Sequence, residues 1–145
     1  MSNPSDNSAS EPREGDLARN VERLADRSQL DFDIEFFGRV LARSPFYLDV
    51  LRCQAPLLSR KGLHEQALQV ERRLVSLRPY DGVAHYNLAC RLALAQQPRE
   101  AVAELGLALE CGYDDFDYLE ADADLESVRQ QPEYQQLLRQ HGVTG

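Results

Sequence analysis

Hydrophobic residues recur at three- and four-residue spacings through most of the chain, which is the pattern of helices that bury one face. Before Pro45 this pattern appears twice, on either side of the polar stretch DRSQLD, and it predicts two amphipathic helices. No β-like alternation of useful length occurs, so we expect an all-α fold. The apolar positions are Leu17, Val21 and Leu24 in the first helix and Ile34, Phe37, Val40 and Leu41 in the second.

Glycine and proline residues set the limits of four further predicted helices. The first of these ends at Gly62, because glycine readily takes the left-handed conformation that closes a helix. The second stops before Pro79, since proline disfavours helical geometry in the residue before it. Pro98 suits the first turn of the last one. The four predicted ranges are 48–60, 64–77, 83–95 and 98–110.

The pattern of apolar and small residues in 48–77 repeats after 34 residues, so that Leu58 aligns with Leu92 and Ala67 with Ala101. Each predicted helix pair has one apolar stripe that a lone pair cannot bury. Stacking successive pairs makes a continuous core, so the period corresponds to one stackable unit. The recurring positions are Leu51, Ala55, Leu58, Gly62, Ala67, Leu74 and Pro79 in one unit, and Leu88, Ala89, Leu92, Ala101, Leu105 and Ala108 in the next.

These residues resemble the tetratricopeptide repeat family, best over 48–81 and next over 82–115. A degenerate unit over 14–47 keeps Leu17, Leu24 and a closing Pro45, with Asp33 where the family prefers alanine. The second good unit departs from the pattern at Gln96 and Tyr113, where the family usually has glycine and proline. The resemblance implies antiparallel helix pairs stacked as a short right-handed α-solenoid.

The two ends of the chain differ from the repeats. Residues 1–13 are rich in Ser, Asn, Pro and acid, and we expect a disordered tail there, followed by a single helical domain over 14–140. Residues 116–140 resemble the capping segment that often follows such repeats, and we call them the C-terminal cap. One predicted helix of the cap carries Leu125 and Val128, and another begins near Pro132 with Tyr134, Leu137 and Leu138.

The resemblance also implies a binding site, because in this family the first helix of each repeat lines a concave groove that binds peptides. Asn87 stands where members that grip a C-terminal carboxylate place an asparagine. Pro56 replaces a second asparagine and Asp117 an expected lysine, so the complete clamp is absent from this pattern. The groove residues carried over are Asp49, Arg52, Pro56 and Arg60 from one repeat and Val83, Tyr86, Asn87 and Cys90 from the next.

Charge changes this picture of the partner. The chain has 43% hydrophobic residues and a net charge of −8, but residues 39–100 hold ten bases and five acids, a local charge of +5. The basic middle favours a ligand with acidic residues or a free carboxylate. Overall acidity disfavours nucleic-acid binding, and no apolar run approaches the roughly 20 residues that span a bilayer. The start of the chain lacks the features of a signal peptide, so we expect a cytoplasmic protein.

Candidate catalytic or metal-binding chemistry is sparse. Cys53, Cys90 and Cys111 form no C-x-x-C pair, and His85 lies five residues before Cys90, so these two do not share a helix face. We expect no catalytic residues, no metal and no cofactor. The acidic run at 113–126 lacks the central glycine of a helix-loop-helix calcium site, and a solvated loop is the preferred interpretation.

The sequence thus predicts a protein–protein interaction module, an adaptor or scaffold without catalysis of its own. Its partner would be another protein, presenting an acidic or C-terminal peptide segment to the groove. Two alternatives stay open. One is a self-associating module that forms a homo-oligomer through an uncovered helix face, and the other is a small enzyme or metal protein using Cys90 and a histidine.

Overall fold

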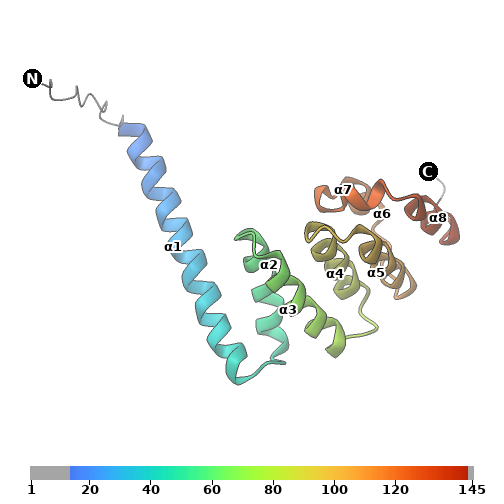
Figure 1. Cartoon of the computed structure of the whole chain (residues 1–145), viewed down its shortest axis with the longest axis horizontal. Coiled ribbons are helices and arrows are strands. Elements are labelled where there is room, and N and C mark those ends of the chain that lie inside the picture. Colours follow the sequence, from blue (N-terminus) through green and yellow to red (C-terminus); the bar gives the residue numbers. More distant parts are fainter. Residues whose placement is uncertain (1–13, 144–145) are drawn as a thin grey trace, which may run out of the picture.

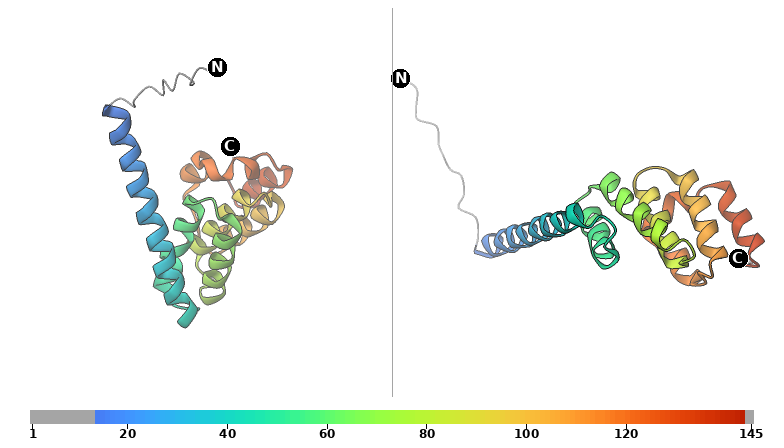
Figure 2. Two further views of the ribbon diagram at one scale, coloured as in Figure 1. Left: turned by 60° about the vertical axis from the view of Figure 1, so that its left-hand side comes forward. Right: turned by 90° about the horizontal axis from the view of Figure 1, so that it is seen from below.

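A computed structural model describes residues 14–143, which contain helices and connecting turns but no strand. The all-α expectation is therefore confirmed for this part of the chain. The helices follow one another in an elongated arrangement from α1 to α8 (Figures 1 and 2). Their bounds are α1 Glu14–Arg43, α2 Leu48–Arg60, α3 His64–Leu77, α4 Gly82–Leu94, α5 Pro98–Glu110, α6 Phe116–Ala121, the 3-10 turn η1 Ala123–Leu125, α7 Glu126–Arg129 and α8 Pro132–Gln140.

The prediction of two helices before Pro45 is wrong, because α1 is one helix of 30 residues. The polar stretch that seemed to divide it contains neither glycine nor proline, and Gln29 donates a hydrogen bond to Asp33 along the helix at 2.8 Å. Only the second half of α1 packs, against α2. The first half stands clear of the other helices in both views of Figure 2, with Leu17, Val21 and Leu24 about half exposed or more.

Helices α2 to α5 pack in chain order, each against the next. The predicted limits of α2, α3 and α5 are confirmed. Helix α4 begins and ends one residue earlier than predicted. The Asp81 carboxylate fixes its start by accepting hydrogen bonds from the amides of Val83 and Ala84. Gly62 has a φ of 83°, the left-handed conformation expected where α2 closes.

The buried side chains form two clusters. One joins the second half of α1 to α2 and α3 and includes Leu41, Leu51 and Leu74. The other joins α4 and α5 to the C-terminal cap, and Val75 of α3 packs against both. The cap is thus part of the core: its fully buried members are Leu119, Leu125, Val128 and Tyr134.

The acidic run at 113–126 is not the solvated loop that the sequence predicted, since most of it forms α6 and η1. Asp115 caps α6 by accepting a hydrogen bond from the Tyr118 amide at 3.1 Å, and Asp122 caps η1 by accepting one from the Asp124 amide at 3.0 Å. The carboxylates that suggested a loop therefore begin helical turns.

Candidate functional site

A hollow of about 290 Å³ lies between α2 and α4. It brings together four residues assigned to the groove from the sequence, Arg52 and Pro56 of α2 with Val83 and Asn87 of α4, although the two helices are separated along the chain by α3. We call it the α2–α4 hollow. Its lining residues are Arg52, Pro56, Glu71, Leu74, Asp81, Val83, Ala84 and Asn87.

One long ion pair, between Arg52 and Asp81, lies at the rim of this hollow. A guanidinium nitrogen of Arg52 lies 3.9 Å from an Asp81 oxygen, and both side chains are partly exposed. The other Asp81 oxygen caps α4, so this residue fixes the helix start and the rim together. Pro56 lies within α2 and has no amide hydrogen to donate to the carbonyl of Arg52.

Glu71 of α3 is the unexpected member of the lining. Its side chain is only 3% exposed, and its Oε2 atom has no hydrogen-bond partner. Oε1 lies 3.7 Å from Nε of Arg91 in α4. Burial raises the pKa of Glu71 to about 7, although the positive charge of Arg91 acts in the opposite direction.

The sequence analysis missed Glu71 because it looked for apolar and groove positions on the first helix of each unit. A signal was present in the period of 34 residues, which aligns Glu71 with Leu105, a side chain with 0% exposure. Aligning the two units would have shown that Glu71 occupies a position where the neighbouring unit has a core leucine.

The other predicted groove residues lie elsewhere. Asp49 and Arg60 are exposed but do not line the hollow, while Tyr86 and Cys90 are buried beneath the cap. The ring of Tyr86 stacks on Tyr113 with a centroid distance of 4.3 Å. In this structure a ligand in the hollow would meet Arg52 and Asn87 but not Tyr86 or Cys90.

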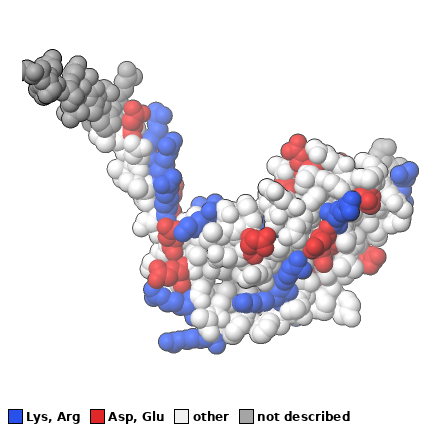
Figure 3. Space-filling view, viewed as in Figure 1, with Lys and Arg blue, Asp and Glu red and all other residues white. Residues whose placement is uncertain are grey.

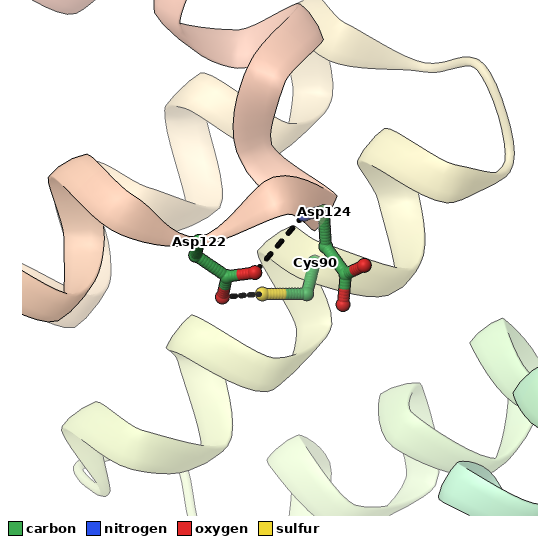
Figure 4. Close-up of side chains that lie close together, drawn as sticks. All are labelled: Cys90, Asp122 and Asp124. Carbon is green, nitrogen blue, oxygen red and sulfur yellow. Dashed lines mark hydrogen bonds between the residues drawn. The ribbon is translucent and has the colours of Figure 1, made fainter.

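Tyr86 and Cys90 meet the cap through one carboxylate (Figure 4). The Tyr86 hydroxyl donates to Oδ2 of Asp122 at 2.5 Å, and the Cys90 thiol lies 3.6 Å from the same oxygen. Burial, and next the hydrogen bond to Asp122, raise the pKa of Tyr86. Burial and then the neighbouring charges of Asp122 and Asp124 raise the pKa of Cys90, so the thiol holds its proton.

Cys90, Asp122 and Asp124 also place three potential metal-ligand atoms within 4.8 Å of one another. In this structure the Cys90 thiol contacts Asp122, whose two carboxylate oxygens accept hydrogen bonds from the Tyr86 hydroxyl and the Asp124 amide. These contacts join α4 to the cap.

His85 is buried beside the α4–α5 contact, with its ring directed at Glu104 and the backbone rather than at Cys90. Nδ1 lies 2.8 Å from a Glu104 oxygen and Nε2 lies 2.6 Å from the Pro79 carbonyl. The thiol of Cys90 instead contacts Asp122. The described contacts therefore do not pair Cys90 with His85.

Charged side chains of both signs are interspersed on the face shown in Figure 3. Arg72 and Arg73 of α3 are exposed, and Arg72 lies 3.3 Å from Glu100. Such exposed ion pairs contribute little to stability. Among the described helices, none is long and apolar enough to cross a membrane.

Comparison with known proteins gives one limited similarity. The chain is 33% identical over 85 residues to a chloroplastic protein of Arabidopsis thaliana, and this match covers 57% of the chain and 25% of that protein. The chain therefore spans about a quarter of the length of this curated relative. No family model matches the chain.

Proposed function

We propose that this protein is an interaction module that binds an extended segment of another protein in the α2–α4 hollow. The observation that carries the proposal is the hollow itself, which is lined by Arg52 and Asn87, two of the residues assigned to a groove from the repeat resemblance. Both side chains donate hydrogen bonds that suit carboxylate or carbonyl oxygens of a peptide.

The wider architecture belongs to the same proposal. Helices 48–77 and 82–110 form two units of a short right-handed α-solenoid of the tetratricopeptide type, and the cap closes its end. Supporting this are the period of 34 residues and the packing of α2 to α5 in chain order. The three cysteines are free thiols, which fits a reducing compartment such as the cytoplasm.

The test begins with selection of peptides from a random library on the full-length protein. Arg52→Glu combined with Asn87→Ala should weaken binding of the selected peptides by roughly tenfold or more, about 1.4 kcal/mol. Circular dichroism and melting should stay unchanged, because both side chains are on the surface or half-buried.

The matched control is Arg72→Glu with Arg73→Glu, on the exposed side of α3. This pair should affect binding less. If the control pair abolishes binding while the hollow variant retains it, the ligand lies on the other face, and our site assignment is wrong.

One observation supports a second candidate function, self-association. The outer side of α1 exposes five large apolar side chains, with relative exposures from 49% to 64%. Apolar surface of this kind marks interaction sites in many proteins. Light scattering on the full-length chain distinguishes a dimer from a monomer. The exposed side chains are Leu17, Val21, Leu24, Phe32 and Phe36.

A further inference from the structure

Glu71 is a carboxylic acid at a core position, and its present contacts do not compensate its burial. The same position in the next unit is Leu105, whose side chain is fully buried. A buried carboxylate is costly unless it is paired and hydrogen-bonded. Here one oxygen lies 3.7 Å from Arg91 and the other has no partner. An unsatisfied buried group beside a hollow therefore calls for an explanation.

The residues that line the α2–α4 hollow beside Glu71 provide both apolar surface and hydrogen-bond acceptors. Leu74, Val83 and Ala84 provide the apolar part, and the Asn87 amide oxygen and the Asp81 carboxylate provide further acceptors at the rim. A lysine side chain has the matching form: an apolar four-carbon stem that packs along such walls and an ammonium group with three donors at its end. The terminal torsion of glutamate is soft, so either oxygen can turn toward the hollow.

The charges around the hollow are compatible with such a ligand. The charged groups that face Glu71 are Arg91 from α4, with Arg52 of α2 and Asp81 on the hollow's wall. Arg52 lies near Asp81, which offsets its charge at the rim. Within the lining itself two acids stand against one base, the reverse of the balance in the surrounding segment.

We infer that Glu71 is a specificity-determining residue of the hollow, and that it accepts the ammonium group of a lysine in the bound peptide. This inference rests on the proposed function and narrows its ligand class. The exposed guanidinium of Arg52 at the rim remains available to a carboxylate elsewhere on the same peptide. The preferred segment therefore carries a lysine close to an acidic residue.

The experiment uses two libraries of short peptides that are random except at the central position. That position is lysine in one library and norleucine, which keeps the apolar stem without the charge, in the other. Both are applied to the immobilised full-length protein at pH 8. We expect roughly tenfold more bound peptide from the lysine library, and a loss of most of this preference in Glu71→Gln. The matched control is Glu65→Gln, an exposed acid on the same helix, which should keep the preference.

The pH profile separates a charge contact from a structural role. Because burial raises the pKa of Glu71 to about 7, its ionised fraction falls between pH 8 and pH 6, and the lysine preference should fall roughly fivefold over this range in the wild type. In Glu71→Gln it should be flat. Glutamine keeps the size of the side chain, and melting curves show that the variant is folded.

The outcomes distinguish the two proposals. If peptides bind but the lysine and norleucine libraries perform alike, or if Glu71→Gln keeps the lysine preference, the inference about Glu71 is wrong and the proposed function stands. If neither library gives bound peptide, both are overturned.

Discussion

At the scale of single residues, His85 shows how two hydrogen-bond acceptors raise the pKa of an imidazole ring. Both ring nitrogens lie within hydrogen-bonding distance of an acceptor, Glu104 or the Pro79 carbonyl, and a neutral imidazole can donate to only one of them. Burial lowers the pKa of His85 and is the largest single influence, but the bonds to Glu104 and Pro79 together raise it above the usual value. The protonated ring is thus the form that the fold stabilises.

The pH dependence of this contribution follows from its sign. A histidine whose pKa is raised by folding stabilises the protein fully below its unfolded pKa of 6.5, and this contribution is lost as the pH rises through the folded value. Glu104→Gln should therefore cost about 1–2 kcal/mol at pH 5.5 and less at pH 9. Denaturant unfolding of both proteins at the two pH values measures the difference. An equal cost at both values would contradict the prediction.

At the scale of elements, Gly82 at the start of α4 allows a close approach of two backbones. A Cβ atom there would lie 3.0 Å from the Ala108 carbonyl oxygen and 3.0 Å from the Tyr113 amide nitrogen. Gly82→Ala should destabilise the protein by about 1–3 kcal/mol, although alanine is the better helix former. Thermal or denaturant unfolding measures the loss.

Gly106→Ala is the matched control in α5. Its Cβ would meet only the end of the Leu137 side chain, at 3.3 Å, and that flexible group can shift. Helix propensity then favours alanine by roughly 0.5–1 kcal/mol. If Gly82→Ala is as stable as Gly106→Ala, the start of α4 packs less tightly against the end of α5 than the structure indicates.

The sequence predicted those elements whose ends are set by local chemistry. Gly62 and Pro98 act within one turn, so α2 and α5 were placed correctly. It failed where the outcome depends on distant packing: the polar residues in the middle of α1 are compatible with a break or with a continuous helix. The site shows the same division. The repeat resemblance implied groove positions on the first helix of each unit, and Arg52 and Asn87 line the hollow, whereas the burial of Tyr86 and Cys90 depends on how the cap folds back.

At the scale of the whole molecule, the cap completes the second core cluster. Its buried residues join Leu105 and Ala108 of α5 in that cluster. Truncation after Gly112 should expose this surface and cause aggregation or loss of cooperative unfolding, seen by light scattering and denaturant titration. A chain ending at Val143, which keeps α6 to α8, is the control and should behave like the full-length protein. A truncated chain that is soluble and equally stable would show that the cap is a dispensable tail.

The long helix α1 gives the molecule two classes of stability. Residues 15–29 are exposed on every side, so their helical hydrogen bonds depend on local propensity alone. Isolated helices of about this length are marginal in water. We therefore expect hydrogen-exchange measurements to show amide protons in this half exchanging through local fraying, and those of α4 and α5 exchanging only when the core opens. A partner that covers the exposed side of α1 would protect the first half of this helix from fraying. Ordering of this half would then accompany binding.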